Sequence, residues 1–179
     1  MHTQMGRVGI LLLALQCLLL ADIARADGAK INHKAPLVTG KTLQQKPIHW
    51  PTLLARYDVI VLTIWGAWCR SCRDELLYLD KLSQRYRQQG QSVLVLGLNV
   101  NRDRDAMRRV VRKHGFRFPI IHDFNHRVVR RYAPATLPTT YLIDKQGIIR
   151  KLYTSSTRSE LKSYQKDINC LLRQQRRKP

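Results

Sequence analysis

The chain has 179 residues, of which 44% are hydrophobic, so it is long enough for one domain with an ordinary core and too apolar to be wholly disordered. Four cysteines are too few for a small fold held together by disulfides, and no apolar run suits a protein with several membrane spans. The formal net charge of +20 favours an acidic partner, nucleic acid or an anionic membrane, and it does not indicate a fold.

The first 26 residues have the layout of a secretory signal peptide. Arg7 precedes an apolar run over residues 8–21, and Ala24-Arg-Ala26 is an A-x-A cleavage signal. Because the run is shorter than the roughly 20 residues of a usual span, we expect cleavage after Ala26 and a periplasmic or otherwise extracytoplasmic protein. An uncleaved membrane anchor is the alternative. Export implies an oxidising compartment and makes a nucleic-acid partner unexpected despite the charge.

The remaining chain alternates strand and helix patterns. Residues 27–34 are polar and expected to be flexible, and residues 35–50 predict a weak hairpin that turns at Gly40-Lys41. Two apolar runs rich in β-branched residues, 58–64 and 92–100, are typical of strands buried on both faces. The other expected elements are helices at 71–89, 103–114, 125–132 and 157–174, strands at 118–121, 139–143 and 148–153, and a basic tail at 175–179.

This order of elements predicts an α/β fold. Alternating strands and helices that end in a hairpin favour a central mixed sheet with helices on both faces, here with an N-terminal β-hairpin extension. The turn at Asp144-Lys-Gln-Gly147 joins the last two strands. We expect a single domain over residues 35–174.

A C-x-x-C motif, Cys69-Arg-Ser-Cys72, lies where the first buried strand meets the first long helix. The two thiols are one turn apart, and the unpaired backbone N–H groups at the helix start favour the thiolate of Cys69. Arg70 and Arg73 add positive charge nearby. We therefore expect a redox pair in which Cys69 attacks and Cys72, inside the helix, resolves. The alternatives are half a zinc site and a permanent structural disulfide.

The segment 64–75 resembles the active site of the thioredoxin superfamily, and most closely its exported TlpA/ResA-like thiol–disulfide oxidoreductases. Trp65-Gly-Ala-Trp68 and Thr136-Leu-Pro-Thr-Thr140, which resembles the cis-proline loop, carry the likeness. The resemblance implies that the Leu137–Pro138 bond is cis and faces the cysteines. It also implies that Leu137 offers backbone hydrogen bonds to a substrate peptide, with Thr136 and Trp68 beside it.

Two features depart from thioredoxin. Arg70-Ser71 replaces the usual x-Pro between the cysteines, which favours a more oxidising couple. The buried acid of thioredoxin falls at Thr63, whose hydroxyl cannot accept the proton of Cys72. Glu75 matches the helix glutamate of the ResA-like group and lies about one turn from Cys72, so we expect it to exchange a proton with that thiol. The alternative for Glu75 is a favourable acid near a helix start.

The sequence thus predicts an enzyme, an extracytoplasmic thiol–disulfide oxidoreductase that reduces disulfides of exported proteins, in cytochrome c maturation among other processes. No cofactor or metal is expected. The expected partners are proteins with disulfides or thiols and a membrane-bound upstream electron donor, with weak contact to an anionic membrane surface. A thiol oxidase running in reverse is one alternative. A thioredoxin-fold copper chaperone is another, for which the candidate histidines are His33, His49, His114, His122 and His126.

Cys170 is the unpaired thiol of the mature chain. It lies roughly 150° from the centre of the apolar stripe of the last predicted helix, so we expect it to be exposed or only shallowly covered. Such a thiol invites an intermolecular disulfide in an oxidising compartment.

Overall fold

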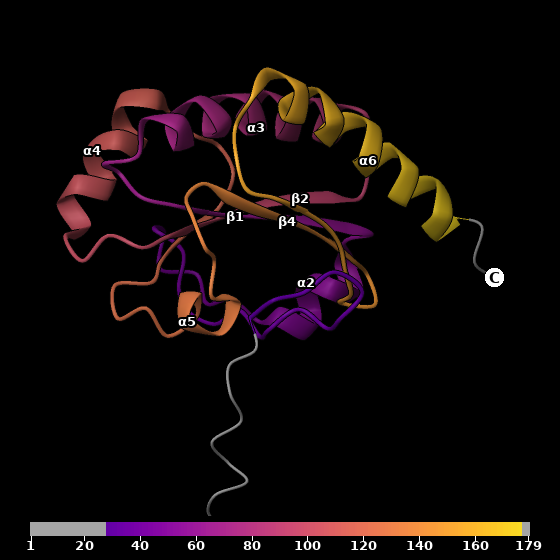
Figure 1. Ribbon diagram of the computed structural model, residues 1–179, viewed down its shortest axis with the longest axis horizontal. Helices are drawn as coiled ribbons and strands as arrows, with labels where there is room; N and C mark the ends of the chain where they lie inside the picture. Colours follow the sequence, from indigo (N-terminus) through magenta and orange to yellow (C-terminus); the bar gives the residue numbers. More distant parts are fainter. Residues whose placement is uncertain (1–27, 177–179) are drawn as a thin grey trace, which may run out of the picture.

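The computed structural model describes residues 28–176, and a five-stranded mixed sheet forms its centre (Figure 1). The strand order is β3-β2-β1-β4-β5. The strands are β1 (Val59–Trp65), β2 (Val93–Asn99), β3 (Ile120–His122), β4 (Thr139–Asp144) and β5 (Ile149–Tyr153). The helices are α2 (Trp50–Arg56), α3 (Arg70–Gln88), α4 (Arg104–His114), α5 (Val129–Tyr132) and α6 (Arg158–Arg176). The predicted α/β architecture is confirmed.

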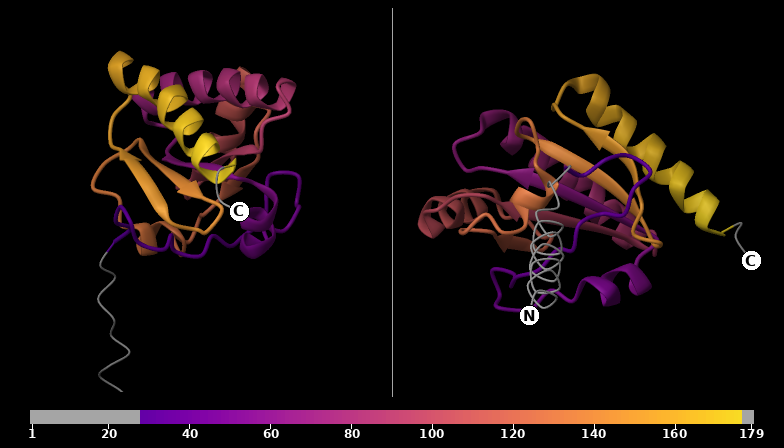
Figure 2. Two further views of the ribbon diagram at one scale, coloured as in Figure 1. Left: turned by 90° about the vertical axis from the view of Figure 1, so that its right-hand side faces the viewer. Right: turned by 60° about the horizontal axis from the view of Figure 1, so that its bottom comes forward.

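Helices cover both faces of the sheet. α3, α4 and α6 lie over one face, and α2 and α5 lie under the other (Figures 1 and 2). Each face has its own apolar cluster. Leu76 of α3 and Ile168 of α6 belong to the first, and Trp50 of α2 and Tyr132 of α5 belong to the second. Two separate cores explain why the central strands are apolar on both sides.

Strand β1 is the centre of the sheet and every one of its residues is buried. It pairs in parallel with β2 and antiparallel with β4, so that Thr63 lies between Gly97 and Thr140. The carboxyl ends of β1 and β2 and the start of β4 therefore meet at one edge of the sheet. This edge carries the C-x-x-C motif.

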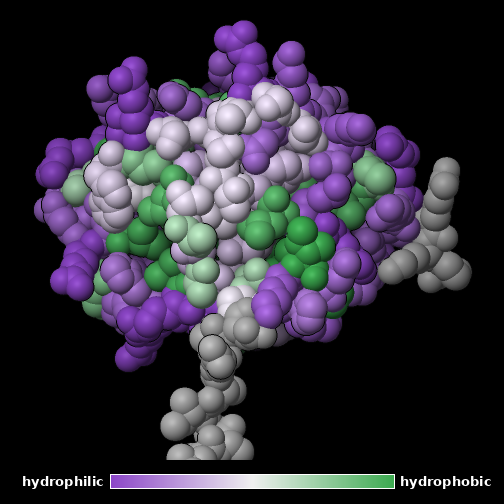
Figure 3. Space-filling view, viewed as in Figure 1, coloured by the Kyte–Doolittle hydropathy of each residue, from purple (hydrophilic) through white to green (hydrophobic). Residues whose placement is uncertain are grey.

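On the face shown in Figure 3, hydrophilic side chains dominate the periphery, and hydrophobic side chains gather in separate patches between them. Among the described residues, five large hydrophobic side chains are exposed, namely Ile31, Leu37, Trp68, Leu77 and Phe124. Trp68, beside the C-x-x-C motif, is the most exposed of them at 65%.

The N-terminal region differs from the prediction. In place of a two-stranded hairpin, one antiparallel bridge, between Lys41 and Pro47, forms within residues 35–50, and Thr42 bridges Ile121 of β3. The turn lies at Thr42–Gln45 instead of Gly40-Lys41. Helix α2 follows, which the sequence analysis did not predict. Its seven residues are too few to show a helical period, and its signals are a proline in the first turn and the buried Trp50.

Part of the segment expected to be flexible is attached to the domain. Ala29 donates its N–H to the carbonyl of Tyr132 at 3.0 Å, and Asn32 donates to the carbonyl of Ile149 at 2.8 Å. Ala35 then donates to Gly147. These bonds join residues 29–35 to α5 and β5, so the ordered body begins before residue 35.

The ends of the chain carry two further predictions. The predicted signal peptide over residues 1–26 and the last three residues of the basic tail lie outside the described part of the chain. The beginning of that tail is helical, because α6 continues to Arg176. No helix in residues 28–176 is both long and apolar enough to cross a membrane.

Candidate active site

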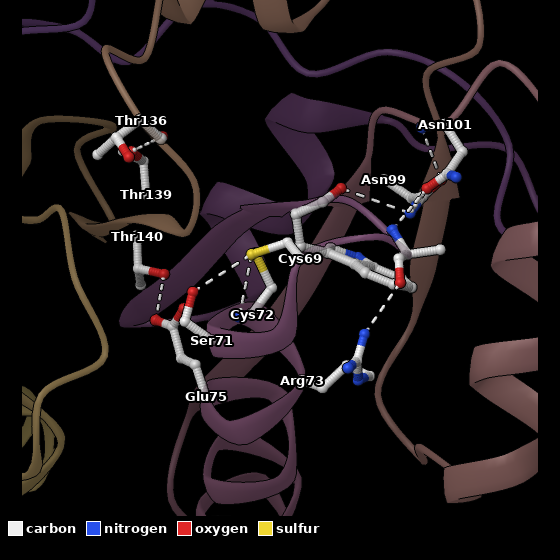
Figure 4. The surroundings of a disulfide bond; sticks show 12 residues. Cys69, Ser71, Cys72, Arg73, Glu75, Asn99, Asn101, Thr136, Thr139 and Thr140 are labelled. Atoms are coloured by element: carbon white, nitrogen blue, oxygen red, sulfur yellow. Dashed lines mark hydrogen bonds between the residues drawn. A yellow bond between two sulfur atoms is a disulfide. The ribbon is translucent and has the colours of Figure 1, made fainter.

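The two cysteines of the motif are joined by a disulfide at the start of α3, with their Cα atoms 5.2 Å apart (Figure 4). Cys69 is the N-cap of the helix, and its Sγ accepts the N–H of Cys72 at 3.1 Å. Cys69 is partly exposed, whereas Cys72 is completely buried. An incoming group therefore reaches Cys69 first, and the helix start offers that sulfur a backbone donor that would also stabilise its thiolate.

An amide network holds the loop that leads into Cys69. The N–H of Ala67 donates to Oδ1 of Asn101 at 2.7 Å, and Nδ2 of Asn99 donates to the same oxygen at 3.0 Å. Arg73 donates from Nη1 to the carbonyl of Ala67 at 3.1 Å, so its guanidinium also fixes this loop. The network lies on one side of the disulfide in Figure 4.

Two histidines donate hydrogen bonds to the backbone of residues 100–101, next to this loop. His122 donates from Nε2 to the carbonyl of Asn101 at 2.7 Å, and His126 donates from Nε2 to the carbonyl of Val100 at 2.9 Å. Because a carbonyl oxygen only accepts, both rings carry a hydrogen on Nε2. Within residues 28–176, no group of three or more His, Cys, Asp and Glu side chains is placed to hold a metal ion.

The proline loop lies at the same edge of the sheet. The Leu137–Pro138 peptide bond is cis, in agreement with the resemblance. Strand β4 begins next to it with Thr139 paired to Ile64, one residue before the end of β1. Thr139 donates from its hydroxyl to the carbonyl of Thr136 at 2.6 Å, and Leu137 packs against the apolar cluster that also contacts Cys69.

A buried carboxyl group lies on the other side of the disulfide. Glu75 has no exposed surface, and its Oε1 accepts the hydroxyl of Thr140 at 2.7 Å and the hydroxyl of Tyr164. Burial raises the pKa of Glu75 from 4.5 to about 7, although the two hydroxyl donors lower it. Its Oε2 and the hydroxyl of Thr63 are both buried, and neither has a hydrogen-bond partner among the described residues. Glu75 is therefore a core residue of α3.

Comparison with known proteins identifies the family. Residues 31–152 match the model of the AhpC/TSA family. The chain belongs to this family. A curated relative, the thiol-disulfide oxidoreductase ResA of Halalkalibacterium halodurans, is 32% identical over 140 residues, which cover 78% of this chain and 74% of the relative. The ResA protein of Bacillus thuringiensis (strain Al Hakam) is 29% identical over 146 residues, which cover 81% of this chain and 82% of the relative.

Solved structures agree on the fold. The crystal structure of a Chlorobium tepidum protein described as a thiol:disulfide interchange protein DsbE superposes with a TM-score of 0.74 at 17% identity. The match covers 81% of this chain and 99% of that one. Together with the cysteine pair, these likenesses make this member of the AhpC/TSA family a thiol–disulfide oxidoreductase with a thioredoxin-like fold.

The hydrogen-bond partners of the site residues in this oxidoreductase were not predicted from the sequence. Thr140 and Tyr164 bond Glu75, and Asn99 and Asn101 hold the loop before Cys69. Tyr164 lies among the buried residues of α6, with Ile168, Leu171 and Leu172. The available signal was its hydroxyl, since a buried tyrosine usually has a hydrogen-bond partner. The two asparagines end a buried strand, where polar side chains also need partners.

Cys170 is partly buried in the second half of α6. Nε2 of Gln174 lies 3.7 Å from its sulfur. The shallow cover agrees with the position that the helical stripe predicts.

Proposed function

We propose that the protein reduces disulfides of exported proteins outside the cytoplasm by cycling Cys69 and Cys72 between dithiol and disulfide. The observation that carries this proposal is the asymmetry of the pair. Cys69 is accessible at a helix start, whereas Cys72 is buried on the same helix as a buried carboxyl group whose pKa is about 7. An accessible nucleophile and a protected resolving thiol are what a disulfide exchange needs.

The reaction begins with the reduced pair. The Cys69 thiolate attacks one sulfur of the substrate disulfide, a Cys69–substrate bond forms, and the other substrate sulfur leaves as a thiolate. Cys72 then loses its proton, and its thiolate attacks Sγ of Cys69. The mixed disulfide breaks and the second substrate sulfur leaves. Two electrons have passed to the substrate, and the pair is left as the disulfide seen in the structure.

Glu75 is proposed to take the proton that Cys72 gives up. Its pKa of about 7 lies close to the working pH, where a group both accepts and releases a proton readily. The hydroxyls of Thr140 and Tyr164 donate to the ionised carboxylate and so stabilise the form that accepts the proton. Thr63, at the position of thioredoxin's acid, has no such role.

The substrate chain is proposed to lie along the proline loop. Pro138 fixes this loop beside the cysteines, and the backbone of Leu137 offers strand-like hydrogen bonds to an extended peptide. Thr136 is exposed at the end of the loop, and Trp68, directly before Cys69 in the sequence, is exposed as well. These three residues would hold the substrate disulfide in line with Cys69.

The remaining parts of the proposal concern location and partners. The predicted signal peptide supports an extracytoplasmic location. After each reaction the Cys69–Cys72 disulfide must be reduced again by a dithiol donor, for which we propose a membrane-bound protein. Cysteines of c-type cytochromes are proposed substrates, on the resemblance to the TlpA/ResA-like group. Net oxidation of substrate thiols is the second candidate, because Arg70 and the missing proline favour a more oxidising couple.

The experiment that tests the proposal uses two matched variants. Cys72→Ser should accumulate mixed disulfides with substrate proteins, and Cys69→Ser should accumulate none, as read by mass spectrometry after acid quenching. The equilibrium of the wild-type pair with glutathione then gives its potential, which we expect to be less reducing than the approximately −270 mV of thioredoxin. Equal trapping by both variants would refute the assignment of roles.

A further inference from the structure

A groove lies beside the proline loop, and its lining combines apolar side chains with ionisable ones. It encloses about 390 Å³ between that loop and α5. Val100, Val129 and Leu137 give it an apolar floor, and Arg130 and His126 are its ionisable lining residues. Leu137 comes directly before Pro138, so the groove opens next to the position that the substrate chain would occupy.

Arg130 is free to meet a ligand. Arg130 is exposed, and within residues 28–176 no ion pair or side-chain hydrogen bond engages its guanidinium. The nearest acid in sequence, Asp123, is buried and accepts the N–H groups of Val128 and Val129. Its carboxylate therefore fixes the start of α5 and leaves the charge of Arg130 unmatched.

The helix start beside Cys69 is also basic. Arg70 follows Cys69 directly and is exposed, and no ion pair with another described residue engages it. On α4, Arg109 pairs with Asp103 at 3.6 Å, so that acid is already matched. Asp74 is an exposed acid one turn into α3. The surface that flanks Cys69 thus has an excess of positive charge.

We infer that the groove selects substrate segments that carry an apolar side chain next to an acidic one, close to the disulfide to be exchanged. The apolar floor would take the first side chain, and Arg130 would pair with the second. Arg70, next to the nucleophile, adds a second attraction, and a basic substrate segment would be repelled by both arginines. This inference rests on the proposed function and names the substrate class of the same site.

The test compares synthetic disulfide peptides that are identical except for one residue beside a leucine next to the cysteine, which is Glu, Gln or Lys. We expect reduced wild-type protein to react about three- to tenfold faster with the Glu peptide than with the Lys peptide at low salt. The difference should shrink at high salt. Arg130→Glu should lower or invert the ratio of the two rates, and Arg130→Gln should give an intermediate ratio.

Arg87→Glu is the matched control, because it makes the same change in net charge on an exposed residue in the last turn of α3, the opposite end from Cys69. It should keep the wild-type ratio. Equal ratios of the two rates in wild type and Arg130→Glu would overturn the inference. An equal loss of the ratio in Arg87→Glu would also overturn it, because the preference would then come from the net charge of the whole protein. Protein that reduces none of the peptides would instead refute the proposed function.

Discussion

Two polar networks flank the disulfide, and they differ in chemistry. On the side of Cys72, Glu75 receives the hydroxyls of Thr140 and Tyr164 inside an apolar cluster. On the side of the loop before Cys69, Asn99 and Asn101 form a network of neutral amides. The first network contains a buried carboxyl group whose pKa is about 7, and the second is built on amide side chains that do not titrate.

The difference separates two tasks. A buried carboxyl group is costly to ionise, so it is useful at a site only where its proton is used. The amide side chains of Asn99 and Asn101 carry no titratable group, so their own hydrogen bonds suit a loop that must present Cys69 in one position. We therefore expect changes in the first network to alter pH dependence, and changes in the second to alter stability and rate at every pH.

Glu75→Gln should have the largest effect. It removes the proposed proton acceptor of Cys72, so resolution of the mixed disulfide at neutral pH should slow by about 100-fold or more, and the acidic limb of its pH profile should vanish. Single-turnover release of the second substrate thiol measures this step. Asp80→Asn, which neutralises another buried acid of α3, is the control and should keep the wild-type profile. An unchanged rate in Glu75→Gln would remove Glu75 from the mechanism.

The pKa of Glu75 also predicts how the stability of the oxidised protein depends on pH. Its folded pKa of about 7 lies above the ordinary value of 4.5, so the folded state holds this proton more tightly than the unfolded state. The contribution of Glu75 to the free energy of unfolding should therefore be highest below pH 4.5, fall as the pH rises to about 7, and stay lower above it by about 3 kcal/mol.

Urea denaturation across this range checks the prediction. Glu75→Gln should lose most of the fall in stability between about pH 4.5 and about pH 7. A variant that keeps the wild-type slope would show that other groups cause it.

Asn101→Leu should break the neutral network. It leaves the N–H of Ala67 and Nδ2 of Asn99 without their common acceptor, which should cost about 1–3 kcal/mol in the free energy of unfolding. The reductase rate should fall without a change in the shape of its pH profile. Asn101→Asp retains the acceptor oxygen and should restore most of the stability. A shifted pH profile in Asn101→Leu would contradict the division of tasks.

Tyr164→Phe and Thr140→Val should have the smallest effects. Each removes one donor to the ionised form of Glu75, so each should raise its pKa further, by about one unit. Carbonyl-labelled NMR titration of Glu75 measures the shift directly. A lowered pKa in either variant would contradict the roles assigned to these hydroxyls.

The sequence predicted what local patterns determine. The buried strands, the helix after the motif and the position of Cys69 and Cys72 at their junction follow from hydrophobic runs and helix-start chemistry. The resemblance supplied the cis bond at Pro138 and pointed to Glu75. Thr140 and Tyr164 could not be paired with Glu75 from the sequence, because they approach it from β4 and α6 only after the chain has folded.

The N-terminal region was harder to predict for a different reason. Helix α2 is shorter than two full helical periods, so its pattern is indistinguishable from an irregular segment. The bonds from Ala29 and Asn32 to α5 and β5 run between backbone groups, to which side-chain patterns give no clue.

The contact between Gly66 and Trp68 restricts which residues the active-site loop can accept. A Cβ atom at position 66 would lie 2.7 Å from two atoms of the Trp68 ring, so any larger residue there must push the indole aside. Positions 66 and 68 consequently behave as one unit in mutagenesis. A side chain at 66 requires either a moved indole or a smaller residue at 68, so libraries that vary both positions together sample combinations that single-position libraries leave out.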